Sequence, residues 1–312
     1  MAAFSSRGPT DDGHIKPEVV APGTNELSTL SQVVGANPLW GNVTPSTHPL
    51  SPGYCWSGGT SMSTPLVAGA AAIIRQHLVQ QRGHFQDGVK PSRALIKAFL
   101  VNGAESMSPG QFTADTIPPL IPAEDEIPTE PNDVNGFGRV NLTESLIPGT
   151  LGQTLFADEP GYAVEIGEIR TFDVQVVDTT QPLRVTLVWT DAPGPANVGG
   201  LENELYLRVV HPNNTIDDGD TDPYPTVKNN VQSVVIDAPA AGTYHMRVHG
   251  VSVTRQSPGA SSGPNPRQDF ALVVSNGMGF STQPVSIAQT IDTTGSMGTF
   301  GYMAPTQERA NQ

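Results

Sequence analysis

One run of residues constrains the fold of this chain more than any other. Small residues and glycines, Ser57-Gly58-Gly59-Thr60-Ser61-Met62-Ser63-Thr64-Pro65, lead directly into the apolar stretch Leu66-Val67-Ala68-Gly69-Ala70-Ala71-Ala72. This pattern predicts a long helix over about residues 61–81, with apolar and small residues on all sides and therefore buried. Ser61 then lies in the first turn, where backbone N–H groups have no helical partner and the helix dipole is positive. That position suits a nucleophile whose attack creates an oxyanion.

The composition bounds the class of protein. A chain of 312 residues, 37% of them hydrophobic and 15% charged, is long enough for two domains and a sizeable core. The 32 glycines and 29 prolines favour loops and short strands over helix bundles. The net charge of −14 argues against a nucleic-acid partner, and the single cysteine, Cys55, excludes an internal disulfide. No apolar run in the sequence has the length of a membrane span.

The pattern changes along the chain. Residues 92–102 predict a second helix, with Ser92 as its N-cap and Gly103 just past its end. From about residue 150, short runs with alternating apolar residues predict the strands of a half-buried antiparallel sandwich. These strands are expected over residues 168–177, 183–189, 205–210, 233–236, 243–248 and 270–274. The acidic, proline-rich stretch 114–132 is expected to be a surface loop.

Four motifs, in order, resemble those of the subtilisin-like serine proteases (subtilases, peptidase S8 family). They are Phe4-Ser5-Ser6-Arg7-Gly8-Pro9, Lys16-Pro17-Glu18-Val19-Val20-Ala21-Pro22-Gly23, the serine run and Gly136-Phe137-Gly138-Arg139-Val140-Asn141. The resemblance covers residues 3 to about 146, with Glu18 where the family has aspartate. It implies a serine-type endopeptidase that acts on protein or peptide substrates without a cofactor. It also implies Ser61 as nucleophile, with Gly59, Thr60 and Met62 on the oxyanion or substrate side.

Two further resemblances concern the rest of the chain. Residues 151–278 resemble the β-sandwich appended to some subtilases, through Leu187-Val188-Trp189-Thr190-Asp191-Ala192-Pro193-Gly194 and Asn229-Asn230-Val231. The final segment resembles the start of a von Willebrand A domain, through Asp292-Thr293-Thr294-Gly295-Ser296. The implied fold is α/β in residues 1–147, as the C-terminal portion of a subtilisin-like parallel-sheet domain. An all-β, jelly-roll-like sandwich follows in residues 148–278, and a truncated A-like domain in 279–312.

Two groups of residues are candidate metal ligands. Asp218, Asp220 and Asp222 alternate as in a calcium loop, which suggests structural calcium, but the glycine and glutamate of an EF-hand loop are lacking and a solvated turn is the favoured interpretation. Asp292, Thr294 and Ser296 are the residues that would bind a metal in a complete A domain.

The remaining family segments are not found in the sequence. The subtilase aspartate segment, histidine segment and oxyanion asparagine all precede the serine run, and no stretch of this chain matches them. His77 lies 16 positions along the helix, about 24 Å from Ser61 at 1.5 Å per residue, and His14 and His48 lie in loops. We therefore expect the C-terminal part of a longer secreted protease, inactive alone, whose partner is the upstream part of the same catalytic domain. A signal peptide is expected further upstream, and the protein is expected to be extracellular.

The alternative belongs to another class of protein. The sandwich and the A-domain start are typical of interaction modules, so the chain is also compatible with a non-catalytic binding or adhesion protein.

Overall fold

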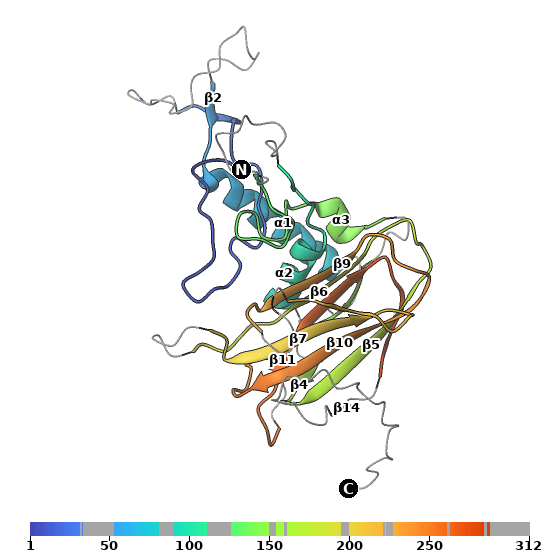
Figure 1. Ribbon diagram of the computed structural model, residues 1–312. Helices are drawn as coiled ribbons and strands as arrows, with labels where there is room; N and C mark the ends of the chain where they lie inside the picture. The colour runs from blue at the N-terminus through green and yellow to red at the C-terminus, as the bar shows by residue number, and fades with distance from the viewer. Residues whose placement is uncertain are drawn as a thin grey trace, which may run out of the picture.

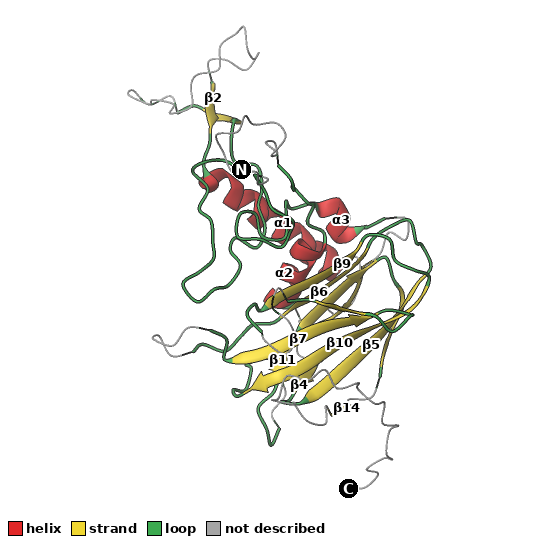
Figure 2. Cartoon of the chain, viewed as in Figure 1, coloured by secondary structure: helices red, strands yellow, loops and turns green. Residues whose placement is uncertain are grey.

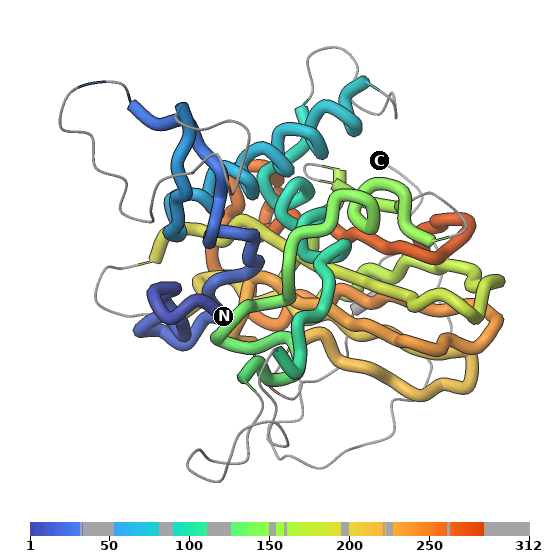
Figure 3. Tube along the Cα trace, turned by 90° about the horizontal axis from the view of Figure 1, so that it is seen from above, coloured from blue at the N-terminus to red at the C-terminus, as the bar shows by residue number. Residues whose placement is uncertain are grey.

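A computed structural model describes most of the chain, and the helices and sheets in it form three layers (Figure 1). The described residues are 1–31, 33, 53–80, 90–110, 126–149, 154–158, 161–194, 200–220, 222, 227–260, 263–283 and 286–287. Helices form the first layer, a four-stranded sheet the second and a six-stranded sheet the third. Figure 2 shows the helices gathered on one side of the two large sheets, and the view from above in Figure 3 shows them lying over these sheets.

Three helices are present among the described residues: α1 (Thr60–Gln80), α2 (Arg93–Asn102) and α3 (Leu142–Leu146). The two predicted helices are confirmed as α1 and α2. Ser92 caps α2 as predicted, because its side chain accepts a hydrogen bond from the N–H of Leu95 at 2.9 Å. The cap is itself held by the carboxylate of Asp158, which accepts from both the N–H and the hydroxyl of Ser92.

The prediction that α1 is buried on all sides is wrong for the described structure. One face, with Ala70, Ile74 and Leu78, packs against α2 and is buried. The other face is open, and its large side chains Leu66 and Ile73 are 48% and 46% exposed. Sequence shows that a helix is apolar all round, but it does not show which faces have a neighbour.

The strands are antiparallel in every sheet. The six-stranded sheet contains, in order, β13 (Met278–Thr282), β5 (Glu168–Val176), β10 (Gly242–Val253), β7 (Asn203–Val210) and β8 (Ile216–Asp218), with β14 (Ser286–Ile287) also pairing with β5. The four-stranded sheet has the order β3 (Thr154–Ala157), β12 (Ala271–Ser275), β6 (Leu183–Val188) and β9 (Val231–Ile236). Two small sheets pair β4 (Ala163–Val164) with β11 (Gln268–Asp269), and β1 (Glu26–Thr29) with β2 (Tyr54–Ser57). All six strands expected from alternation are present, within a few residues of their predicted ends.

The two large sheets share one apolar core. Alternate residues of β5, β7 and β10 are buried, as in Phe172, Leu207 and Met246, and they meet Leu187 and Leu272 from the four-stranded sheet. This alternation matches the prediction of strands that face a core on one side.

The four-stranded sheet is buried on its second face as well. In β12, Leu272 and Val274 face the core between the sheets, whereas Ala271 and Val273 belong to a second core that α2 completes. Phe99 of α2 is fully buried there and meets Phe156 of β3 edge to face, with ring centroids 5.8 Å apart. The sheet is therefore the middle layer of the molecule and not a solvated face.

Hydrogen bonds also join α2 and the residues after it to the four-stranded sheet. The side-chain amide of Asn102, at the end of α2, donates to the hydroxyl of Thr186 and to the carbonyl of Val273. The Arg184 guanidinium donates to the carbonyl of Ala104 at 3.1 Å. Because buried polar groups need partners, these bonds fix the rotation of α2 on the sheet.

Several predictions about domain organisation remain predictions. Among the described residues up to 149, the paired strands β1 and β2 are antiparallel, and a single parallel bridge joins Val20 to Arg139. The boundary placed at residue 278 falls within β13, whose backbone pairs with β5. The candidate A-domain residues Asp292, Thr294 and Ser296 lie outside the described residues.

Residues 15–23, here called the strap, run between the helices and residues 137–140. Their one acidic side chain, Glu18, pairs with Lys16 and with Lys97 of α2, the latter at 2.7 Å. Burial alone would raise the pKa of Glu18, but the charges and hydrogen bonds of Lys97 and Lys16 outweigh it and lower the pKa from 4.5 to about 2.

We expect the substitution Phe99→Ala to lower the free energy of unfolding by about 3–5 kcal/mol, because it leaves a cavity between α2 and the sheet. Urea denaturation of the purified chain measures this. Ile73→Ala, on the open face of α1, is the control and should change stability by less than about 0.5 kcal/mol. A loss below about 1 kcal/mol for Phe99→Ala would contradict the packing of helices on the sheet.

The Glu18 ion pairs should make stability depend on pH. A carboxyl whose pKa is lowered on folding contributes stability above pH 4.5, and the contribution disappears as the pH falls toward 2. Lys97→Met should raise the pKa of Glu18 by about one unit or more and flatten this dependence. NMR titration of the Glu18 carboxyl measures the shift, with the exposed Lys90→Met as control. An unchanged titration in Lys97→Met would show that the pair does not form.

Candidate active site

Ser61 is the second residue of α1 and is exposed. The helix begins at Thr60 because Gly59 turns the chain with a φ of 140°, a conformation that side chains oppose. The carbonyl of Gly59 accepts the N–H of Met62 at 3.0 Å, which closes the turn around Ser61. Pro65 has no N–H to donate to the carbonyl of Ser61, so the helix is also less tightly bonded at this point.

The end of the strap supports this turn. The N–H of Gly59 donates to the carbonyl of Gly23 at 2.7 Å. A Cβ atom on Gly23 would lie 2.2 Å from the Ser63 hydroxyl oxygen and 2.9 Å from the Gly59 carbonyl oxygen. The last residue of the second motif must therefore be glycine for the strap to approach the serine turn this closely.

The other residues predicted beside the nucleophile do flank it. Thr60 is exposed, and its carbonyl accepts the Thr64 hydroxyl at 2.9 Å within the first turn. Met62 is half-buried, with its sulfur 3.8 Å from the hydroxyl of Ser57. The result is a small hydroxyl residue on an open helix N-terminus, where first-turn N–H groups can stabilise a negative charge.

A base for Ser61 is not found in the part of the chain that the structure describes. His77 lies near the other end of α1, and His14 lies beside Asn229 at the sheets. His211 and His245 each pair with an aspartate, Asp217 and Asp173, at 2.7 Å. These last two histidines belong to the six-stranded side, which the four-stranded sheet separates from the helices. His48 and His84 lie outside the described residues.

Among the described histidines, His249 has the largest shift in pKa. It lies on β10 and is 6% exposed, and burial, followed by the charges of Arg208 and Arg247, lowers its pKa to about 3. The side chain is therefore neutral at physiological pH, but it is enclosed in the six-stranded sheet, away from Ser61.

The three carboxylates of the predicted calcium loop have protein partners. Asp218 accepts from Arg208 at 2.8 Å, and Asp222 lies 3.3 Å from the Lys228 ammonium. Asp220 accepts five N–H groups, from the backbones of Asp222, Lys228 and Asn229 and from the side chains of Asn229 and Gln232. Among the described residues, no three His, Cys, Asp or Glu side chains converge as metal ligands. Calcium binding stays a prediction.

Sequence reasoning gave no role to two polar residues that fix loops, Asp191 and Asn229. Asp191 accepts the backbone N–H groups of Glu202 and Asn203, and burial raises the pKa of its carboxyl in spite of these bonds. Asn229 is 5% exposed and joins the strap to the sheets. Both residues lie in motifs that carry the sandwich resemblance, and polar residues at the ends of apolar strands were the available signal.

No helix in the described part of the chain has both the length and the hydropathy needed to cross a membrane.

Comparison with known proteins supports the interpretation of the N-terminal part. Residues 1–138 match the Subtilase family (Peptidase_S8). The matched range contains the strap, the serine turn, α1 and α2, which are the elements that position Ser61.

Similar proteins have related names. The serine protease/ABC transporter B family protein tagB of Dictyostelium discoideum is 27% identical over 302 residues, which cover 81% of this chain and 15% of that protein. Pyrolysin of Pyrococcus furiosus is 32% identical over 145 residues, 46% of this chain and 8% of pyrolysin. The minor extracellular protease Vpr of Bacillus subtilis is 42% identical over 78 residues, 24% of this chain and 8% of Vpr.

The chain thus spans no more than 15% of the length of these three relatives. Within that span, the family match and the geometry of the serine turn agree on the same residues. Residues 1–138 carry a subtilase (peptidase S8) family domain.

Proposed function

We propose that this chain carries the nucleophile of a serine-type endopeptidase, and that the nucleophile is Ser61. The observation that carries the proposal is the exposed Ser61 hydroxyl on the first turn of α1, at a turn built by Gly23 and Gly59. This turn lies within the residues that match the subtilase family, and the relatives named above are proteases.

The chemistry follows from the position of the hydroxyl. The Ser61 Oγ attacks the carbonyl carbon of a peptide bond while its proton passes to a histidine, which an aspartate orients. The carbonyl oxygen becomes an oxyanion, and the first-turn N–H groups of α1 stabilise it. The leaving amine takes the proton, and water then hydrolyses the acyl group on Ser61. This chain supplies the nucleophile and part of the oxyanion site.

We propose that the histidine and aspartate come from a segment of the same catalytic domain that precedes Met1 in a longer polypeptide. The open face of α1, with Leu66 and Ile73, is a surface for that segment to cover, since exposed apolar patches of this kind mark contacts. Beside it, a cleft of about 290 Å³ between α1 and α2 is lined by Val67, Ile96 and Leu100. Its rim carries charged side chains that would pair with polar groups of the segment.

The extracellular location and structural calcium are also proposals. The name of Vpr, a minor extracellular protease, supports the first. The alternative of a separate binding or adhesion module is less favoured, because α2 covers the outer face of the four-stranded sheet and shares a core with it. A module that folded independently would expose that face.

A fluorophosphonate probe tests the proposed function. We expect the 312-residue chain alone to react at least about 10⁴-fold more slowly than a chain extended by the coding sequence that precedes it, because the described residues place no histidine beside Ser61. In the longer chain, Ser61→Ala should abolish labelling and Ser63→Ala should preserve it. Mass spectrometry of the labelled peptide identifies the residue.

Two outcomes would contradict the proposal. Rapid labelling of Ser61 in the chain alone would show that the base is already present. A longer chain that folds, contains the aspartate and histidine segments and still fails to label at Ser61 would remove the assignment of the nucleophile.

A further inference from the structure

We propose that Asn229, a residue of the sheets, is a positioning residue for the Ser61 turn and acts on it through the strap. The inference rests on the proposed function, because it concerns the nucleophile of that reaction. It adds a role for the sheets: their loop before β9 fixes one end of the strap, and the other end of the strap holds the turn that precedes Ser61.

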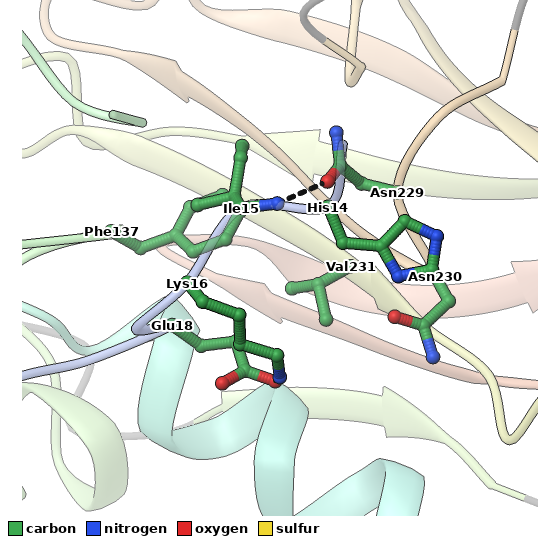
Figure 4. Close-up of a pocket in the computed structure, with 8 residues that line it drawn as sticks. All are labelled: His14, Ile15, Lys16, Glu18, Phe137, Asn229, Asn230 and Val231. Atoms are coloured by element: carbon green, nitrogen blue, oxygen red, sulfur yellow. Dashed lines mark hydrogen bonds and ion pairs between the residues drawn. The ribbon is translucent and has the colours of Figure 1, made fainter. Parts of the chain in front are cut away.

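The first step is the contact between Asn229 and Ile15. Asn229 is 5% exposed, and its Oδ1 accepts the backbone N–H of Ile15 at 2.8 Å, as Figure 4 shows. The orientation of this amide is fixed by charge. Its Nδ2 donates to the carboxylate of Asp220 at 3.2 Å, and only an amide N–H can face a carboxylate there. The Oδ1 atom must therefore point toward the strap.

The carboxylate of Asp220 in turn holds the loop that carries Asn229. It accepts the backbone N–H groups of Lys228 and Asn229 at 3.1 and 3.2 Å, and the side-chain amide of Gln232 on β9 at 3.2 Å. With the Asn229 side-chain amide and the backbone N–H of Asp222, five N–H groups hold this carboxylate in place, since charge-assisted bonds are the stronger ones. The acceptor for Ile15 is thus fixed to the sheet and does not move with the strap.

The middle of the strap is hydrogen-bonded to its neighbours at two residues, Glu18 and Val20. The carbonyl of Glu18 accepts the N–H of Phe137 at 2.8 Å, and Val20 exchanges bonds of 3.0 Å with Gly138 and Val140. The carboxylate of Glu18 binds Lys97 of α2. Near Asn229, Figure 4 shows Ile15 and Val231 close to Phe137, and the cavity between these residues is only about 10 Å³, the size of one water molecule. Beside Asn229 the strap therefore has little room to shift, whereas Glu18 and Val19 also line the cleft between α1 and α2.

The far end of the strap reaches the active-site turn. The carbonyl of Gly23 accepts the N–H of Gly59, two residues before Ser61, at 2.7 Å. Gly23 also approaches the Ser63 hydroxyl so closely that no Cβ atom would fit. The strap is bonded at Ile15, Glu18, Val20 and Gly23, so a displacement of Ile15 is passed along these bonds to Gly59.

A charge-swap series tests this coupling in the 312-residue chain by amide hydrogen exchange, which requires no activity. Asn229→Asp puts a second carboxylate 3.2 Å from Asp220 and should raise exchange about tenfold at both Ile15 and Gly59. The double variant Asp220→Asn/Asn229→Asp restores one donor and one acceptor, and should return Gly59 to within about threefold of the native rate. Asn230→Asp is the matched control, because the adjacent Asn230 side chain donates to Trp189 and not to the strap.

A second variant approaches from the other end and covers the case in which Asn229→Asp does not fold. Gly23→Ala displaces the strap at Ser63, and coupling between two sites is reciprocal, so exchange at Ile15 should rise as well. The amides of β5 report global unfolding and should keep their protection in each variant. Two outcomes would overturn the proposal. One is faster exchange at Ile15 with unchanged exchange at Gly59 in Asn229→Asp, and the other is faster exchange at Gly59 with unchanged exchange at Ile15 in Gly23→Ala.

Labelling by the fluorophosphonate probe in the longer chain separates this inference from the proposed function. We expect Asn229→Asp to slow labelling of Ser61 about tenfold, and the double variant to recover it, whereas a merely structural role predicts no recovery. If exchange at Ile15 and Gly59 is coupled but Ser61 never labels, the connection through the strap stands and the proposed function is wrong. Full labelling in Asn229→Asp, with exchange raised at both amides, would show that the coupling does not position Ser61.

Discussion

The packing of α2 on the four-stranded sheet is the interaction on which the rest of the structure depends. An antiparallel sheet of this kind commonly leaves one face to water, but in this chain β12 has apolar residues on both faces, with Leu272 on one and Val273 on the other. The sheet is stable only when a third layer covers its outer face. Phe99 and its neighbours on α2 provide that layer, so the helices and the sheets form one continuous body.

The serine turn depends on this body in two ways. Through the helices, α2 supports the buried face of α1, which begins one residue before Ser61. Through the strap, Asn229 and Glu18 connect the sheets and α2 to Gly23 and Gly59. The first connection is apolar and fixes where the helix lies, whereas the second is polar and fixes the direction of the turn. Together they place a short polar loop, which has little packing of its own, against a rigid scaffold.

Local signals in the sequence predict local structure well. The bounds of α1, the cap at Ser92 and the alternating strands each arise from interactions between residues a few positions apart, and the structure confirms them. The open face of α1 could not be predicted, since it depends on which parts of the chain are available to cover the helix. The hydrogen bond between Ile15 and Asn229 joins residues 214 positions apart, and no sequence pattern in either segment predicts it. The parallel sheet, likewise, is a non-local feature that the family resemblance implies and that the described strands do not test.

The difference between local and non-local interactions also explains what kind of candidate site this chain holds. A nucleophile's position can be specified locally, by two glycines, a helix N-terminus and a strap that is already bonded in place. Its reactivity cannot be specified in this way, because a serine hydroxyl needs a base within hydrogen-bond reach. Of the described histidines, His211 and His245 pair with aspartates on the six-stranded side, His77 lies far along α1, and His14 lies in a loop beside Asn229. The proposed function therefore assigns the position of the nucleophile to this chain, and proton transfer to a second segment that would cover the open face of α1. Bringing a second segment onto that face would complete the core of α1 and the reactive site in a single step.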